Sequence, residues 1–413
     1  MNQTTTARPI TGAIQHYAWG GTDYLPQLLG RSNSDNQPWA ELWLGTHPKG
    51  TARLEAEERT LADLIAEDPN AMLGEEVADK YGDQLPFLLK VLDVKQMLSI
   101  QTHPERGAAK RGFRDEEKAG IARDAPDRNF RDRNHKPELA VALTEFYLLH
   151  GFRPTADIRA SLEAFRGWEV MLPLLEKEGI TELYRHVMQL DQREVNQLLS
   201  PLQERLGKMS ADVLDKEGAD YWAAEAFRQY TDEEGNYDRG IFSVYWLNIV
   251  RLHPGEGIFQ AAGIPHAYLR GACIELMANS DNVLRGGLTK KHIDVPQLLT
   301  NLNFSSIEPH HIQRVLTVDN WRHYPTPAED FQLSVRQFNE GEVVEENDMG
   351  PAIYLVMSGS VQLDDNTVLF KGQSCFLPAG AVMELAAQEF STIYRASVGE
   401  RPNQEEHDAR LKK

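Results

Sequence analysis

The chain of 413 residues contains only two cysteines, Cys273 and Cys375, which excludes a disulfide-rich scaffold. One disulfide at most could form, and the apolar neighbours of Cys273 favour a buried free thiol instead. No apolar run approaches the ~20 residues that a membrane-spanning helix requires. The first six residues show no basic segment followed by an apolar one, as a secretion signal would. These absences predict a cytoplasmic protein with no membrane partner.

Positive charge is scarce as well. Lys and Arg together number 43 against 62 Asp and Glu, which gives a formal net charge of −19. A nucleic-acid-binding surface needs a basic footprint, so the sequence predicts no nucleic-acid partner. An anionic small molecule remains compatible, because a local group of Lys and Arg can outweigh the field of the whole protein. Apolar residues make up 41% of the chain, which is long enough for two or three domains with sizeable cores.

Four residues with metal-binding side chains are the most informative feature that is present. An apolar, β-prone run that begins at Leu85 leads into Gln101 and His103. Residues two apart in a strand lie on the same face, so we expect both side chains to point the same way. Glu138 and His266 each follow a proline further along the chain. Singly, each has an ordinary interpretation, such as a core histidine or a surface carboxylate. Together they form a nitrogen and oxygen ligand set that suits zinc, and iron or manganese also accept it.

Basic and hydroxyl residues near these positions are candidates for binding an anion. Lys90 lies within the apolar run, where a buried ammonium group is costly without an anion or a carboxylate partner. Ser99 supplies a hydroxyl donor just before the first two metal-ligand candidates. Arg285 carries a planar group that can donate two hydrogen bonds to a phosphate. The two lysines at residues 290–291 are also candidates, although we favour a solvated pair on a turn.

Four separated segments, in the same order and at compatible separations, resemble the type I phosphomannose isomerase family. They are residues 39–48, 85–104, 134–138 and 263–289. The resemblance is strong in the N-terminal third and around residues 250–300, and it is weak over the middle and the C-terminal quarter. Two loop positions depart from the family pattern: Gly286 stands where alanine is frequent, and Lys290 where proline is usual.

The resemblance implies a zinc-dependent aldose–ketose isomerase. Such an enzyme interconverts mannose 6-phosphate and fructose 6-phosphate through an enediol, so the expected partner is a small sugar phosphate. One zinc ion per chain is expected, and the family's ligand positions correspond to Gln101, His103, Glu138 and His266. We expect a monomer and leave a homodimer open.

Isomerisation moves one proton between adjacent carbons, which requires an acid–base group and a cation beside the developing oxyanion. The candidates for this chemistry are His135, Lys136, Glu275, Asp281 and Arg285. Arg285 is expected to stabilise the enediolate, Lys136 to handle the proton with His135 or Glu275, and the identity of the base stays open. The candidates for substrate binding are Lys90, Ser99, Glu41 and Tyr268.

Two other functions are compatible with the same residues. A metal-dependent cupin oxygenase would use His and carboxylate ligands on iron(II), and Gln101 as a fourth ligand argues against it. A non-catalytic cupin that binds sugar phosphates would lack the proton-transfer residues, whereas Lys136, Asp281 and Arg285 are all present.

The predicted fold is mainly β, with two cupin-like jelly-roll domains and an inserted α-helical domain. Residues 1–152 and 239–312 are expected to form the catalytic cupin, residues 153–238 the helical insertion, and residues 313–413 a C-terminal cupin-like domain without metal. The histidines of that last region, His323 and His407, do not form a ligand-like pair.

Two local predictions concern polar or proline-containing segments. Apolar residues at helical spacing from Val195 onward predict a helix, and Ser200, Pro201 and Gln203 suggest that a new helix starts there with a capping box. Residues 114–134 are rich in Arg and Asp, which predicts a long exposed excursion.

Overall fold

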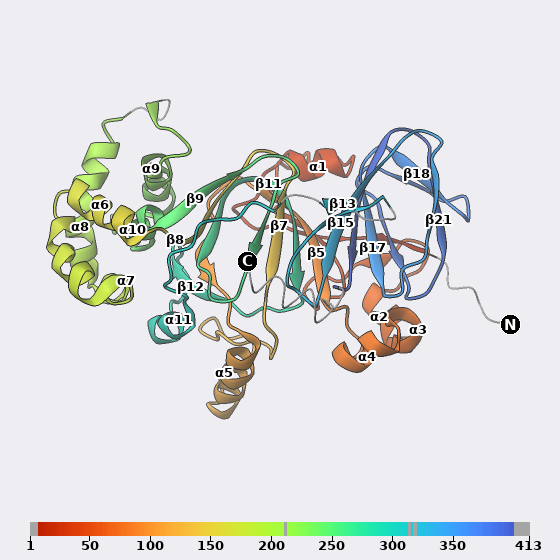
Figure 1. Cartoon of the computed structure of the whole chain (residues 1–413), viewed down its shortest axis with the longest axis horizontal. Helices are drawn as coiled ribbons and strands as arrows, with labels where there is room; N and C mark the ends of the chain where they lie inside the picture. Colours follow the sequence, from red (N-terminus) through yellow and green to blue (C-terminus); the bar gives the residue numbers. More distant parts are fainter. Residues whose placement is uncertain (1–6, 210–212, 313–314, 317–319, 400–413) are drawn as a thin grey trace.

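The computed structural model describes residues 7–209, 213–312, 315–316 and 320–399. It is a mainly β structure with helices, which confirms the predicted fold class at that level. Figure 1 shows the helices α6 to α10 gathered at one end of the molecule, with the strands occupying the middle and the other end. Within the described ranges, no helix combines the length and the apolar character needed to cross a membrane. His407 lies outside the described residues.

The central β unit is a ten-stranded antiparallel sheet that folds back on itself. Its main path runs in the order β10 (Gly257–Gln260), β7 (Glu138–Ala142), β11 (His266–Ala278), β5 (Phe87–Val94), β3 (Glu41–Leu44) and β2 (Ala13–Gln15). The remaining strands are β6 (Ile100–Thr102), β8 (Phe146–Phe152), β9 (Leu247–Leu252) and β12 (Leu284–Gly287). Strand β11 belongs to both parts of this unit, because its first residues pair with β6 and β8 and its later residues pair with β5 and β7.

Strand β11 changes direction at Gly271. The ladder with β8 shifts register between Tyr268 and Arg270, and Gly271 follows with a φ of +116°. A Cβ atom at Gly271 would lie 2.4 Å from the carbonyl oxygen of Glu145, so only glycine fits. The bend lets one strand present side chains to the unit's interior from two differently oriented ladders.

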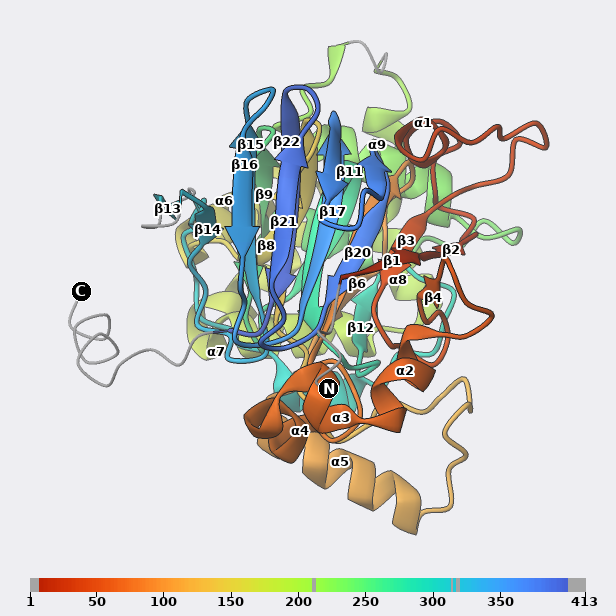
Figure 2. The same ribbon diagram turned by 90° about the vertical axis from the view of Figure 1, so that its right-hand side faces the viewer.

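The second β unit consists of an eight-stranded and a four-stranded antiparallel sheet. The larger sheet has the order β13 (Val315–Leu316), β14 (Arg322–Tyr324), β15 (Gln332–Phe338), β22 (Ser391–Ser397), β17 (Ala352–Ser358), β20 (Ser374–Leu377), β1 (Arg8–Thr11) and β4 (Arg53–Leu54). The smaller sheet contains β16 (Val343–Glu346), β21 (Met383–Ala387), β18 (Ser360–Leu363) and β19 (Val368–Phe370). Strands from the beginning of the chain therefore complete the C-terminal sheet, as Figure 2 shows beside β20. The predicted domain boundaries assign residues 1–152 to the first unit and therefore do not include this contribution of β1 and β4 to the second unit.

Helices cover the β units and fill the insertion between β8 and β9. The insertion contains α6 (Thr155–Ala164), η1 (Trp168–Met171), α7 (Leu172–Gln189), α8 (Gln192–Leu206), α9 (Ala219–Tyr230) and α10 (Gly240–Trp246). The other helices are α1 (Tyr24–Leu28), α2 (Leu61–Glu67), α3 (Pro69–Leu73), α4 (Glu75–Tyr81), α5 (Arg106–Lys118) and α11 (Val295–Asn301). The insertion shares one apolar core with the adjoining strands of the central β unit, around the fully buried Trp168, Trp222 and Trp246. Both cysteines are buried free thiols, as predicted for Cys273.

The predicted helix start at Ser200 and Pro201 is wrong. Helix α8 runs unbroken through Pro201, and its capping box is formed by Asp191 and Glu194. The Ser200 hydroxyl donates to the carbonyl oxygen of Asn196 at 2.7 Å, one turn back in the same helix. The apolar face on both sides of Pro201 packs into one core, and this packing outweighs the lost backbone hydrogen bond.

The predicted exposed excursion at residues 114–134 is confirmed for most of its residues, although the segment is not exposed throughout. Helix α5 extends to Lys118, and the following segment folds back so that Phe130 is only 2% exposed. Glu116 accepts hydrogen bonds from the backbone N–H groups of Asn129 and Phe130 at 3.0 and 2.8 Å. Arg128 is buried and donates to Glu117 at 2.8 Å. Most of the segment is thus exposed, and polar residues pair with one another where the chain folds back around Phe130.

A buried carboxylate joins the two β units. Asp330, which precedes β15, has a side chain that is 0% exposed. It lies 2.7 Å from Nε2 of His135, in the loop before β7 of the first unit, and 2.9 Å from Arg106, at the start of helix α5. Burial raises the pKa of Asp330, but its contacts with His135 and Arg106 outweigh burial and lower the pKa below the usual value.

We expect Asp330→Asn to lower the free energy of unfolding at pH 7 by about 2 kcal/mol, the contribution of hydrogen bonds to a charged group. The pKa of Asp330 is lower in the folded protein than in the unfolded chain, where it is about 4. The stabilisation is therefore complete above about pH 4 and is lost as the pH falls through the pKa of the folded state. Urea unfolding at pH 7 and pH 3 measures both effects. The adjacent, exposed Glu329 provides the control, because Glu329→Gln should cost less than about 1 kcal/mol. If Asp330→Asn lowered the free energy of unfolding equally at pH 3 and pH 7, the stabilising role of the ionised Asp330 carboxylate would be contradicted.

Candidate metal centre and active site

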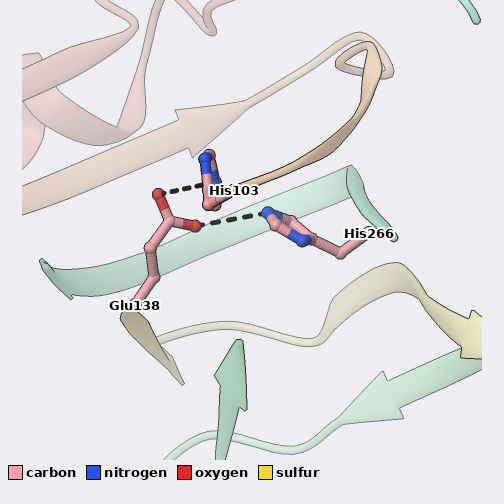
Figure 3. Close-up of side chains that lie close together, drawn as sticks. All are labelled: His103, Glu138 and His266. Atoms are coloured by element: carbon pink, nitrogen blue, oxygen red, sulfur yellow. Dashed lines mark ion pairs between the residues drawn. The ribbon is translucent and has the colours of Figure 1, made fainter. Parts of the chain in front are cut away.

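Three of the four predicted metal ligands converge inside the first β unit. His103 follows β6, Glu138 begins β7 and His266 begins β11, and all three side chains are 0% exposed. The Glu138 oxygens lie 3.4 Å from Nε2 of His103 and 3.3 Å from Nε2 of His266. Figure 3 shows one oxygen of the carboxylate facing each imidazole ring. The ligand atoms all lie within 4.8 Å of one another, so one cation can contact all three.

The two histidines are oriented through their other ring nitrogens. Nδ1 of His103 lies 2.8 Å from the carbonyl oxygen of Asn282, and Nδ1 of His266 lies 2.9 Å from that of Ile264. Donation from Nδ1–H leaves an Nε2 lone pair directed at Glu138 on each ring, which is the usual arrangement around a bound metal. Burial lowers the pKa of His103 and so favours the neutral imidazole.

The electrostatics of this cluster fit a divalent metal. Burial raises the pKa of Glu138, but the charge of the adjacent Lys136 outweighs it and holds the pKa well below its usual value. Among the described residues, both Glu138 oxygens and both Nε2 atoms are buried without a hydrogen-bond partner. An ionised carboxylate that faces two imidazole lone pairs needs a cation between them, and two His with one carboxylate is a common metal-binding set.

Gln101, the fourth predicted ligand, lies beside the cluster at a more open position. It is directly opposite His266 in the β6–β11 ladder and opposite Arg285 in the β6–β12 ladder. Cross-strand partners share a face of the sheet, so all three side chains start from the same side. Gln101 and Arg285 are partly exposed, whereas His266 is buried. Solvent therefore approaches the buried cluster from the side of Gln101 and Arg285.

Asn282 connects His103 to the loop that precedes β7. Besides its backbone contact with His103, its side-chain oxygen accepts from the backbone N–H groups of Arg131 and Asp132 at 2.7 and 3.2 Å. Its amide donates to the carbonyl oxygen of Asn134 at 2.8 Å. Asn282 thus fixes both a metal-ligand candidate and the segment that leads to Glu138.

A second buried charge network adjoins the cluster on the same face. Glu275 is two residues from Met277, the cross-strand partner of Glu138, and Lys90 is the cross-strand partner of Glu275. Nζ of Lys90 lies 2.9 Å from Glu275 and 3.4 Å from Glu41. Burial lowers the pKa of Lys90, but the two carboxylates outweigh it and raise the pKa above its usual value. The sequence predicted an anion or a carboxylate as the partner of this buried lysine, and the structure shows two carboxylates.

Lys136 and His135, two further acid–base candidates, contact different carboxylates. Lys136 is 8% exposed, and its Nζ lies 3.0 Å from Glu138. The ring of the preceding residue, His135, instead contacts Asp330 of the second β unit. Tyr268 is 1% exposed, its ring lies 6.4 Å from that of His266, and burial together with the Glu275 charge raises its pKa.

The partly exposed side of the site is rich in cations. Asp281 lies 2.7 Å from Lys49 and 3.4 Å from His47; although burial raises the pKa of Asp281, these two partners lower it below its usual value. Burial and the charge of Arg131 lower the pKa of Arg285, and burial with the charges of Arg285, Arg131 and Lys49 lowers that of Lys291. These cations are close enough to repel one another, so the exposed Lys291 is not an isolated solvated residue.

Several of these residues were missed from the sequence. They are His47, Lys49, Arg131 and Asn282. His47 and Asn282 lie within segments that carry the family resemblance, but their spacing alone gave no reason to select them. Lys49 and Arg131 could have been found only by knowing which segments meet in space.

The unusual Gly286 has a packing explanation. A Cβ atom there would lie 2.8 Å from the hydroxyl oxygen of Tyr184, which extends from helix α7 toward the backbone of β12. The Tyr184 hydroxyl lies 3.3 Å from the carbonyl oxygen of Gly286. The glycine thus lets the helical insertion contact the strand that carries Arg285.

The fold and the cluster define a mainly β protein with a buried His–Glu–His centre of the kind that binds a divalent metal. Residues 8–155 match the family model described as phosphomannose isomerase type I, catalytic domain. The chain is 37% identical over 387 residues to the mannose-6-phosphate isomerase of Salmonella typhimurium, covering 90% of this chain and 94% of that protein. It is 35% identical over 326 residues to the Homo sapiens enzyme, covering 72% and 73% of the two chains. The chain belongs to the type I phosphomannose isomerase family.

Solved structures of that family have the same fold. The mannose 6-phosphate isomerase of Salmonella typhimurium, bound to fructose 6-phosphate and zinc, superposes with a TM-score of 0.85 at 34% identity. The match covers 96% of this chain and 100% of that one. A structure of mannose 6-phosphate isomerase bound with zinc and yttrium gives the same TM-score and coverage.

We expect Lys90→Met to lower the free energy of unfolding by about 3–5 kcal/mol, because it leaves Glu41 and Glu275 buried without their cation. Urea unfolding at pH 7 measures the change. Lys49→Met is the matched control: this lysine is 54% exposed and also contacts a carboxylate, so its loss should cost about 1 kcal/mol or less. Equal effects of the two substitutions would contradict the importance of the buried network.

Proposed function

We propose that this protein is a zinc-dependent isomerase that interconverts mannose 6-phosphate and fructose 6-phosphate through an enediol. The observation that supports this most directly is the buried His103–Glu138–His266 cluster, with its ligand atoms free to bind a cation, beside a second network of acid–base groups. Family membership and the zinc and fructose 6-phosphate bound by a relative supply the reaction and the metal.

His103, Glu138 and His266 would hold the zinc ion, and Gln101 would complete the set from the partly exposed side. When bound, zinc supplies a Lewis acid that polarises the sugar carbonyl and neutralises developing negative charge. Lys136, at 3.0 Å from Glu138, keeps that carboxylate ionised and so prepared for a metal.

The proton that moves during the reaction leaves C2 of open-chain mannose 6-phosphate and arrives at C1. As the base accepts it, the C2–H electron pair forms the C1–C2 double bond and the carbonyl oxygen gains negative charge. The C1 oxygen then gains a proton and the C2 hydroxyl loses one, and return of the carbon-bound proton to C1 forms the ketone at C2. Glu275 and Lys136, the two buried acid–base groups on the side of Glu138, transfer this proton between C2 and C1. Arg285 stabilises the enediolate oxygen.

Substrate positioning divides between the buried network and the cations near the open side. Lys90 and Glu41 orient Glu275, and the buried Tyr268 shapes the interior beside His266. The partly exposed Ser99 and the mutually repelling Arg131 and Lys291 suit the phosphate group, because an anion between them relieves the repulsion. Asp281 keeps Lys49 beside this group. His135 remains a candidate for the acid–base steps, although its ring is held by Asp330.

The fold details follow the same proposal. Each β unit would be a cupin-like jelly roll, the first carrying the metal and the second none, with residues 153–238 as a helical insertion. Facing antiparallel sheets with apolar interiors support this architecture, and β1 and β4 are added to the second unit. We also propose a cytoplasmic, monomeric enzyme; two buried free thiols fit a reducing compartment.

We expect His103→Ala to lose zinc and isomerase activity together, because it removes a ligand from the centre of the cluster. Zinc content and a coupled assay of mannose 6-phosphate conversion, before and after chelator and with zinc restored, measure both. His253→Ala, at an exposed histidine between β9 and β10, should leave both unchanged. A zinc-free but fully active His103→Ala variant would refute the ligand role. Oxygen consumption with iron(II), without sugar turnover, would favour the oxygenase.

Glu275→Gln should lower kcat by about 10²–10⁴-fold with a much smaller change in KM, because it removes a proton acceptor but keeps the shape of the side chain. Steady-state kinetics with mannose 6-phosphate measure the two constants, and unchanged zinc content shows that the metal centre is intact. Glu384→Gln, at an exposed position of β21, is the control for the same chemical change. An unchanged kcat would assign the proton to Lys136 or His135 instead.

A further inference from the structure

Unsatisfied polar atoms concentrate around the metal centre beyond its predicted ligands. Within the part of the chain that the structure describes, most buried side chains with a partnerless N or O atom lie here: Thr102, His103, Glu138, His150, Gln260, His266 and Tyr268. Gln260 resembles Glu138 in this set, because both of its side-chain polar atoms are partnerless while the residue is 0% exposed, but it lies outside the predicted ligands. A buried amide that makes no hydrogen bond is costly, so its retention requires an explanation.

The strand register places this amide next to Glu138. Gln260 ends β10 and is the direct cross-strand partner of Glu138 in the antiparallel β10–β7 ladder. Paired residues in such a ladder share a face, with Cβ atoms about 4.5–5.5 Å apart, so a glutamine side chain can reach the carboxylate opposite. The other polar neighbours of Glu138 approach from different elements: Lys136 from the preceding loop, and the two histidines from the ends of β6 and β11.

His150 holds the strand that carries Gln260. It is the cross-strand partner of His266 in the β8–β11 ladder, and its Nε2 lies 3.3 Å from the carbonyl oxygen of Phe259, the residue before Gln260. His150, His266, Glu138 and Gln260 are thus linked in a ring, with Phe259 closing it. His150 contributes by fixing β10 through Phe259, which is a contact with the backbone and not with the metal centre.

We propose that Gln260 is a positioning residue of the metal centre: its amide N–H, partnerless in the structure, donates to the Glu138 carboxylate when a metal is bound and restricts the rotation of that carboxylate. This inference rests on the proposed metal centre, but it concerns a residue outside the predicted ligand set. A hydrogen bond to the second oxygen of a ligating carboxylate is a typical outer contact of metal sites, and such contacts change metal affinity about 10–100-fold.

The test compares Gln260→Met with the wild-type full-length protein. Methionine preserves the length and most of the volume of glutamine but cannot donate a hydrogen bond. We expect zinc affinity, measured by competition with a chromophoric chelator, to fall at least about tenfold. The visible absorption spectrum of the cobalt(II)-substituted protein should change as the carboxylate reorients. The melting temperature of the metal-free variant should stay equal or rise, because the unpaired buried amide is gone.

Ile258→Val is the matched control. Ile258 lies two residues before Gln260 on the same face of β10, is 1% exposed and pairs with Ala140 instead of Glu138. It should lower the melting temperature slightly and leave zinc affinity and the cobalt spectrum unchanged. The control thus separates a change in packing from a change at the metal centre.

Each result decides between clear alternatives. Wild-type zinc affinity and an unchanged cobalt spectrum in Gln260→Met would overturn the positioning role while leaving the proposed isomerase intact. Gln260→Leu is made in parallel, and if neither variant folds without metal, the amide is required for the fold itself and the positioning role is also overturned. Failure of the wild-type protein to bind zinc would overturn the metal centre and this inference together.

Discussion

The structure of the site depends on one constraint, the burial of the ionised Glu138 carboxylate at the start of β7. A buried charge is tolerated only when surrounding groups compensate it. Here Lys136 and the imidazoles of His103 and His266 surround the carboxylate. Since both Nε2 atoms point toward the oxygens, this compensation is incomplete until a cation enters. The low pKa of Glu138 and the partnerless ligand atoms are two consequences of the same arrangement.

Strand β11 lets the protein build this arrangement with few elements. Its first residue, His266, faces the cluster within the ladder of β6 and β8, and after the bend at Gly271 the same strand pairs with β5 and β7. Glu275, in the later part, therefore lies on the face that carries Glu138 and opposite Lys90. Metal-ligand candidates and acid–base candidates are positioned by one continuous strand, so a shift in its register would displace both sets together.

The sequence was sufficient to predict what depends on local spacing or on family motifs, and insufficient where distant segments meet. The i, i+2 spacing of Gln101 and His103 and the buried lysine at position 90 were both interpretable locally, and the structure supplies Lys90 with its expected carboxylate partners. The identity of those partners depends on a strand register between residues 185 positions apart. The proline within α8 misled for a related reason, because a continuous tertiary core overrode a local signal.

The overall charge of −19 and an anionic substrate are compatible because the two act over different distances. Charges on the surface are screened beyond about 8–10 Å in physiological salt, so the acidic majority of the chain hardly reaches the site. Within that distance, burial and the charge of Arg131 lower the pKa of Arg285, and burial with the charges of Arg285 and Arg131 lowers the pKa of Lys291. A cluster of like charges is destabilising by itself and becomes favourable when a phosphate binds. The same logic applies to the metal centre, where Lys136 compensates part of the charge of the Glu138 carboxylate and a bound cation would compensate the rest.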